Sequence, residues 1–137
     1  MKYLILLLVM LLTVSICNAD PSGELLDAIS MVESGGGKNP YIKDKSGLCW
    51  GEYQIKMCVI KDVNRIYKTH YKHTDAFDPI KSREICFLYL CWWGEWFKKQ
   101  TGIEPTNRTY ARIWNEGYYH MNSKKALAYW GKIKQYL

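Results

Sequence analysis

Glu33 and Asp44 are the residues of this sequence whose types and spacing could do chemistry. Glu33 shares one helical face with Leu26 and Ile29 and lies just before the helix-ending run Gly35-Gly36-Gly37. Partial burial and the negative end of the helix dipole both disfavour an ionised carboxylate there, so we expect a raised pKa. A carboxylic acid that stays protonated near neutral pH is what general-acid catalysis requires.

Asp44 follows eleven residues later, in a segment expected to fold back over the end of that helix. Retaining cleavage of a glycosidic bond uses two carboxyl groups about 5–5.5 Å apart, one protonated and one ionised. Each residue also has a structural interpretation. A glutamate at a helix end is usually solvated, and an aspartate before Lys45-Ser46-Gly47 is a common turn residue. Placement alone leaves both interpretations open.

The elements that must position these residues are mostly helical. Periodicity and capping residues predict a helix from Ser22 to about Ser34, a small hairpin or irregular β segment within 41–55, and a second helix over 58–67. Asp78-Pro79 opens a further helix whose apolar stretch 85–97 we expect to be the central buried helix. Two final helices are predicted from their N-caps, Thr106 and Ser123. The predicted class is α+β, predominantly helical, with the hairpin beside the helix that carries Glu33.

The first 19 of the 137 residues have the character of a secretory leader. Lys2 precedes an apolar run over 4–16, and Cys17-Asn18-Ala19 ends in the small residue that signal peptidase requires. The run is too short for a comfortable membrane span, which takes roughly 20 residues. We therefore expect a leader at 1–19, a single domain at 20–137 without a stable membrane anchor, and secretion, to the periplasm if the source is a Gram-negative bacterium.

Four cysteines remain after the leader, an even number in an exported chain, which favours disulfides. Two of them stand five apart on one predicted helix, where their side chains diverge too far to pair. We expect one or two bridges from the 49–58 segment to that helix. No zinc-type spacing occurs, so no metal or other cofactor is predicted. The four cysteines are Cys49, Cys58, Cys86 and Cys91.

Several short motifs, in this order, resemble the invertebrate-type (destabilase-like) lysozymes, within the lysozyme-like and lytic transglycosylase superfamily. They are Glu33-Ser34-Gly35, Gly51-Glu52-Tyr53-Gln54-Ile55-Lys56, Tyr110-Ala111-Arg112-Ile113-Trp114-Asn115-Glu116-Gly117 and Tyr129-Trp130. The resemblance extends from about Leu25 to the C-terminus. It implies a lysozyme-like fold, Glu33 as the proton donor, and Asp44 as the nucleophile or charge stabiliser.

The same motifs supply candidate substrate-binding residues. Side-chain amides suit the N-acetyl and hydroxyl groups of an amino sugar, aromatic rings can lie against sugar rings, and glycine lets backbone approach a ligand closely. Core packing is the alternative for the two tyrosines, and a solvated side chain is the alternative for the lysine. The candidates are Tyr53, Gln54, Lys56, Tyr89, Trp114, Asn115 and Gly117.

Together these patterns predict a secreted, monomeric muramidase that hydrolyses the β-1,4 bond between N-acetylmuramic acid and N-acetylglucosamine in peptidoglycan. The net charge of +6, which becomes +5 when Lys2 leaves with the leader, suits an anionic cell wall. The sequence contains no basic run interleaved with aromatic residues, so we predict no nucleic-acid partner. Three alternatives stay open: a lytic transglycosylase, a non-catalytic wall glycan-binding protein, and a cationic membrane-active protein.

Overall fold

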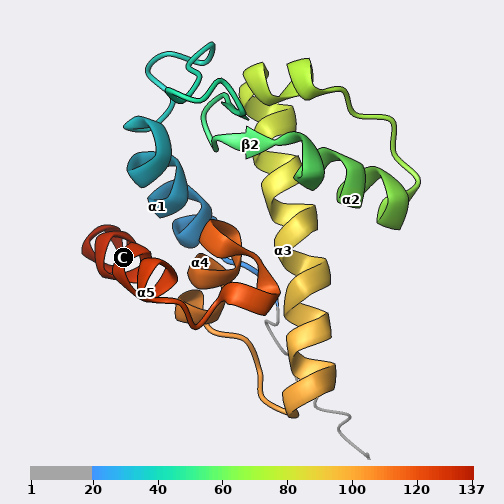
Figure 1. Cartoon of the computed structure of the whole chain (residues 1–137), viewed down its shortest axis with the longest axis vertical. Helices are drawn as coiled ribbons and strands as arrows, with labels where there is room; N and C mark the ends of the chain where they lie inside the picture. Colours follow the sequence, from blue (N-terminus) through green and yellow to red (C-terminus); the bar gives the residue numbers. More distant parts are fainter. Residues whose placement is uncertain (1–19) are drawn as a thin grey trace, which may run out of the picture.

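The computed structural model describes residues 20–137, so the predicted leader at 1–19 lies outside the described residues. Within residues 20–137, the α-helices and strands are arranged around the longest helix, which runs the length of the molecule (Figure 1), and three short 3₁₀ helices accompany them. In chain order they are α1 (Gly23–Ser34), β1 (Cys49–Trp50), β2 (Ile55–Lys56), α2 (Met57–Tyr67), α3 (Pro79–Thr101), α4 (Asn107–Glu116) and α5 (Lys124–Ile133). The predicted class, α+β and predominantly helical, is confirmed.

Helix α1 begins and ends where the sequence predicts. The Ser22 side chain accepts a hydrogen bond from the Leu25 amide at 3.1 Å, which satisfies one of the free donors of the first turn. Gly35 ends the helix in the left-handed conformation, and its amide bonds the Met31 carbonyl. The buried face of α1 lies in the main core, and this packing fixes the position of the last turn, which carries Glu33.

Helix α3 begins as predicted, but it is buried on one face only. The Asp78 carboxylate accepts hydrogen bonds from the Ile80 and Lys81 amides, and Pro79 occupies the first turn. Ile85 is fully buried, whereas Trp92 is 38% exposed. Over 85–97 this helix is central, as expected, but it is buried only on the side that the neighbouring elements cover.

Helices α4 and α5 pack against each other and against α1. Thr106 and Ser123 are their N-caps, as predicted, each accepting a hydrogen bond from an amide of the first turn. Figure 1 shows both helices on the same side of α3 as α1, away from the hairpin and α2. The fold thus has two parts that meet at the C-terminal end of α1.

The predicted hairpin is present. β1 pairs antiparallel with β2, and an isolated bridge joins Lys43 to Trp50. Asp44 organises the turn that precedes β1: its backbone amide bonds the Cys49 carbonyl, and its own carbonyl accepts the Gly47 amide. Within residues 20–137, no helix combines the length and apolar character needed to cross a membrane.

The expected disulfides do not form, and all four cysteines of the described range are free thiols. Cys86 is completely buried in the core on α3, whereas Cys58 is exposed on α2. Cys49 lies on the hairpin, and Cys91 is half-buried one turn beyond Cys86. A disulfide requires its two sulfur atoms in contact, and no two of these four cysteines are bonded. The even cysteine count indicated pairing but carried no information about position.

Gly51 holds the hairpin against the rest of the molecule, so we expect Gly51→Ala to be strongly destabilising. Its φ is +76°, and a Cβ there would lie 1.7 Å from the Ala76 carbonyl oxygen. The expected loss of unfolding free energy is at least about 3 kcal/mol, measured by denaturant or thermal unfolding.

Gly47→Ala is the matched control, because Gly47 has a similar φ of +71° but no neighbouring atom within 4 Å of an added Cβ. It should lose only the cost of a left-handed residue, about 1–2 kcal/mol. Equal losses for the two variants would show that the close approach at Gly51 does not constrain the hairpin.

Candidate active site

Most of the residues predicted from the sequence line one cleft of about 250 Å³. Glu33 comes from the end of α1, and the hairpin, α2, α4 and α5 supply the other walls. The cleft therefore lies where the two parts of the fold meet. Its lining residues are Glu33, Asp44, Cys49, Gln54, Lys56, Val59, Trp114, Asn115 and Lys125.

The Glu33 carboxyl group is withdrawn from water and held by two side chains. The Tyr129 hydroxyl donates a hydrogen bond to Glu33 Oε1 at 2.7 Å. Burial raises the pKa of Glu33 above its ordinary value, although the hydrogen bonds from Tyr129 and Trp114 and the charges of Lys56 and Lys132 act in the opposite direction.

Asp44 has the opposite electrostatic character. Its Oδ2 accepts a hydrogen bond from Ser46 at 2.5 Å, and its Oδ1 accepts the amides of Leu48 at 2.9 Å and Cys49 at 3.0 Å. The Ser46 hydroxyl and the Cys49 amide are the main reasons that the pKa of Asp44 falls to about 2. The cleft thus contains one carboxyl group that favours its proton and one that favours its charge.

Two side-chain amides line the same cleft. Asn115 Oδ1 is buried and has no hydrogen-bond partner among the described residues, so it is available to accept a bond from a ligand. Gln54 Nε2 donates a hydrogen bond to the Gly51 carbonyl at 2.8 Å. Its φ of +52° is rare for a residue other than glycine, and such strain is characteristic of functional sites.

Three predicted binding residues lie outside the cleft. Tyr53 is fully buried in the core, where Arg83 donates a hydrogen bond to its hydroxyl at 3.0 Å. Tyr89 is 8% exposed and packs its ring edge-on against Trp114. Gly117 ends helix α4 with a φ of +79°. For the two tyrosines, core packing is therefore the correct interpretation, because their rings are buried and leave no exposed face for a sugar ring.

The structure also identifies residues in or beside the cleft to which the sequence assigned no role in catalysis or substrate binding. Tyr129 belongs to a quoted motif, yet nothing in the spacing indicates that it reaches Glu33 across 96 positions. Lys125 comes from the start of α5 and forms an ion pair with Glu116 at 2.6 Å. Cys49 and Val59 complete the wall on the hairpin side. Only the tertiary arrangement of α5 and the hairpin reveals these residues.

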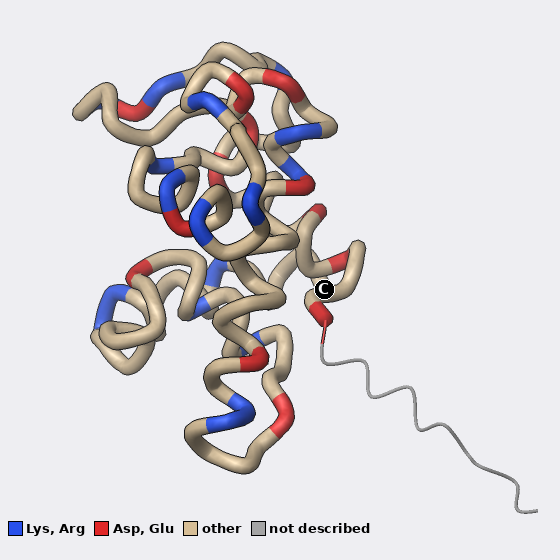
Figure 2. Tube along the Cα trace, turned by 90° about the vertical axis from the view of Figure 1, so that its right-hand side faces the viewer, with Lys and Arg blue, Asp and Glu red and all other residues tan. Residues whose placement is uncertain are grey.

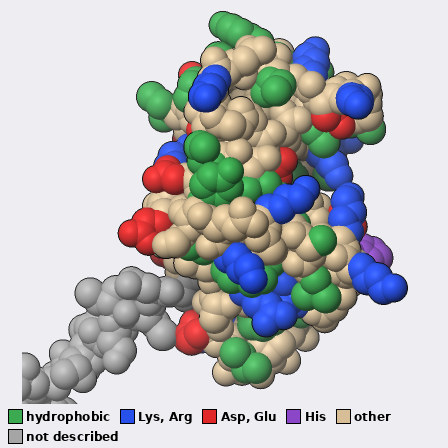
Figure 3. Space-filling view, turned by 90° about the vertical axis from the view of Figure 1, so that its left-hand side faces the viewer, with side chains coloured by type: hydrophobic (Ala, Val, Ile, Leu, Met, Phe, Trp, Pro, Cys, Tyr) green, Lys and Arg blue, Asp and Glu red, His purple; other side chains and the backbone are tan. Residues whose placement is uncertain are grey.

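Lysines lie close to the cleft as well. Lys56 and Lys125 line it, and Lys132 lies near enough to influence the Glu33 carboxyl group. Along the trace of residues 20–137, basic and acidic positions are interspersed (Figure 2). On the side of the molecule where α5 lies, however, several Lys and Arg side chains gather close together (Figure 3). The surroundings of the cleft are therefore suited to an anionic ligand.

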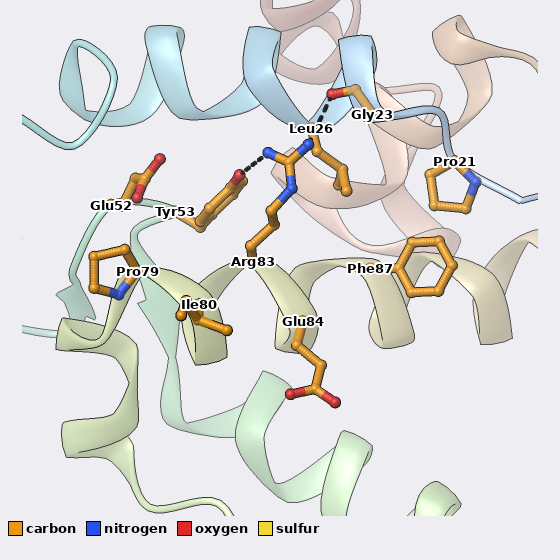
Figure 4. A pocket seen from close by; sticks show the side chains of 10 residues that line it. All are labelled: Pro21, Gly23, Leu26, Glu52, Tyr53, Pro79, Ile80, Arg83, Glu84 and Phe87. Carbon is orange, nitrogen blue, oxygen red and sulfur yellow. Dashed lines mark hydrogen bonds between the residues drawn. The ribbon is translucent and has the colours of Figure 1, made fainter.

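A larger groove, of about 640 Å³, lies between α1 and the N-terminal half of α3 and shares no lining residue with the cleft (Figure 4). Arg83 crosses it from α3, donating to Asp27 and to Tyr53 and also to the Gly23 carbonyl at 3.2 Å. These bonds join α3 to the start of α1. The guanidinium thus has a structural role. Glu52 and Glu84 also line the groove, and Glu52 accepts a hydrogen bond from Ser30 at 2.5 Å.

Comparisons with known proteins add no relative. A scan against protein-family models, a search of curated proteins and a search of solved structures each give no match. Within the part of the chain that the structure describes, no cluster of three or more His, Cys, Asp or Glu side chains could hold a metal ion. The geometry of the cleft therefore carries the functional argument.

Proposed function

We propose that this protein is a secreted glycoside hydrolase, a muramidase that cleaves the β-1,4 bond between N-acetylmuramic acid and N-acetylglucosamine. The observation that carries the proposal is that two different carboxyl groups line one cleft. Burial raises the pKa of Glu33, whereas hydrogen bonds lower the pKa of Asp44 to about 2. Environments that drive two carboxyl pKa values apart are characteristic of glycosidase acid and stabiliser pairs.

The proposed chemistry assigns one step to each group. The Glu33 carboxyl group donates its proton to the glycosidic oxygen while the bond from that oxygen to the anomeric carbon breaks. The Asp44 carboxylate stabilises the positive charge that develops on the sugar or forms a bond to it. Water then attacks the anomeric carbon and gives up a proton to the Glu33 carboxylate, which restores the acid; where Asp44 has bonded to the sugar, that bond breaks in the same step and the Asp44 carboxylate is released. The burial of Glu33 and the hydrogen bonds to Asp44 support this assignment of roles.

The rest of the cleft supports an amino-sugar polymer as the substrate. The free Asn115 Oδ1 can accept the N–H of an N-acetyl group, and the half-buried Trp114 indole can lie against a sugar ring. Lys56 and Lys125 provide positive charge for the carboxylates of muramic acid and of wall peptides. Release of soluble fragments from purified peptidoglycan by the protein tests the proposal, and no release from the folded protein would contradict it.

A lytic transglycosylase is the second candidate, and one observation favours it. Ser46, Leu48 and Cys49 already engage both oxygens of the Asp44 carboxylate, as expected of a residue that mainly organises a turn. In a transglycosylase, Glu33 alone would act as acid and then as base, and the 6-hydroxyl of the muramic acid would attack in place of water. The product would then carry a 1,6-anhydro end.

We expect Tyr129→Phe to move the pH profile of turnover. The Tyr129 hydrogen bond lowers the pKa of Glu33, so its removal should raise that pKa further. Because catalysis requires protonated Glu33, the alkaline limb of kcat/KM should shift to higher pH, and its maximum should fall roughly tenfold as the carboxyl group loses its orientation. A pH–rate profile measures both effects.

The matched control is Tyr136→Phe, which removes a hydroxyl from a residue that is 51% exposed near the C-terminus. Its profile should coincide with that of the wild type. An unmoved alkaline limb in Tyr129→Phe would mean that Tyr129 does not position the acid.

A further inference from the structure

The C-terminal half of α3 carries an aromatic surface that the cleft does not use. Trp92 and Trp96 stand one turn apart on the outer face of the helix, and Trp92 is 38% exposed. A hollow of about 630 Å³ lies over them, and all of its lining residues belong to this helix or to its C-cap. They are Trp92, Glu95, Trp96, Lys98, Lys99 and Gly102.

This surface lies far along α3 from the catalytic cleft. Figure 1 shows the end of α3 at the opposite end of the molecule from the hairpin and β2. The hollow shares no residue with the cleft. Inner aromatic residues of the same segment are used for packing, as Trp93 is by stacking on Tyr118, so the outer pair is not required by the core.

Charged side chains, among them Glu95 and Lys99, lie next to the two indoles. Glu95 is exposed and lies between the tryptophans in the chain, and the Lys99 ammonium lies 5.7 Å from the centre of the Trp96 ring. Lys98 forms an ion pair with Glu104 at 2.5 Å. A carboxylate acceptor therefore lies next to the two indoles, and an ammonium donor lies over the Trp96 ring.

This pattern matches the chemistry of a sugar chain. Each pyranose ring has an apolar C–H face that can lie on an indole and a rim of hydroxyl groups that donate and accept hydrogen bonds. Two rings one helical turn apart, roughly 6 Å along the axis, can meet successive sugars of an extended strand. An anionic lipid surface fits less well, because its negative headgroups would repel and desolvate the exposed Glu95 carboxylate.

We propose that Trp92, Glu95, Trp96 and Lys99 form a second glycan-binding site, which holds a peptidoglycan strand while the cleft acts elsewhere on the polymer. The identity of the ligand rests on the proposed function. The binding itself requires no turnover. The site would increase residence on insoluble wall material without changing the chemical step.

The test is co-sedimentation of the protein with purified, insoluble peptidoglycan, carried out in a Glu33→Gln background so that the polymer stays intact. Trp92→Ala with Trp96→Ala should weaken binding at least about tenfold. Glu95→Ala with Lys99→Ala removes only exposed polar groups and should weaken it about threefold or more. Ile80→Ala with Tyr136→Ala removes exposed apolar surface elsewhere and should leave binding unchanged.

Unchanged sedimentation of both α3 variants would overturn the proposal. A second result would also overturn it: the tryptophan variant loses binding to vesicles with one quarter anionic phospholipid but keeps its binding to peptidoglycan. That result would assign the patch to a membrane. Cleavage of short soluble glycan oligomers by chains with native Glu33 is measured separately. It should be equal in wild type and in the tryptophan variant, and its absence in both would contradict the proposed function while leaving the binding result intact.

Discussion

Glu33→Gln is expected to lower turnover of peptidoglycan by about 10²–10⁴-fold, the range that general-acid catalysis contributes. Glutamine keeps the shape of the side chain and an oxygen that can accept the Tyr129 hydroxyl, but it has no proton to donate to the leaving oxygen. Binding of the glycan should persist, because the lost interaction belongs to the transition state. Fragment release over time measures the effect.

Two further measurements make this result specific to Glu33. Glu24→Gln, which changes an exposed glutamate in the first turn of the same helix, should retain full activity. Stability supplies the second. Burial raises the pKa of Glu33 in the folded protein above the ordinary value of 4.5. The free energy of unfolding is therefore unaffected below about pH 4.5, and it falls as pH rises from there through the raised pKa, because the buried carboxyl group then ionises. Glu33→Gln should therefore melt higher than the wild type at neutral pH and show no such gain below about pH 4. Full activity in Glu33→Gln would contradict the assignment of the acid.

Asp44→Asn is expected to reduce hydrolysis by about 10²-fold or more, because the developing positive charge on the sugar loses its counter-charge. The asparagine oxygen can still accept the Leu48 and Cys49 amides, so the turn before β1 should keep its shape. The acid limb of the wild-type pH profile should fall near pH 2, where Asp44 takes up a proton. Initial rates of fragment release measure both.

Ser46→Ala is the companion variant, because it removes the strongest contribution to the lowered pKa of Asp44 while keeping the carboxylate. It should retain most activity at neutral pH, with its acid limb shifted to higher pH. Undiminished turnover in Asp44→Asn would remove Asp44 from the mechanism and favour the transglycosylase.

Much of the fold follows from local sequence signals. Ser22, Asp78, Thr106 and Ser123 each cap the helix that the sequence predicts after them, since a side-chain oxygen can satisfy the first amides without any tertiary partner. Burial is harder to predict. Trp92 lies in a run of apolar residues yet faces solvent, because the number of elements packing around α3, and not the run itself, decides which face is covered.

In the candidate site, too, some residues could be predicted from the sequence and others could not. Residue type and resemblance identify Glu33 and Asp44, and the structure places both in one cleft. The role of Tyr129 depends on how α5 crosses α1, and a contact between positions so far apart leaves no local pattern. Tyr53 illustrates the reverse error: its neighbour Gln54 faces the cleft, but Tyr53 itself points into the core.

Mass spectrometry of the glycan ends released from purified peptidoglycan tests the central claim most directly, with Glu33→Gln as the control. The two-carboxylate account predicts free reducing ends at N-acetylmuramic acid, absent from the control digest. Anhydro-muramic ends would contradict hydrolysis and assign the cleft to a lytic transglycosylase, and no fragments from the folded wild type would contradict catalysis on this substrate.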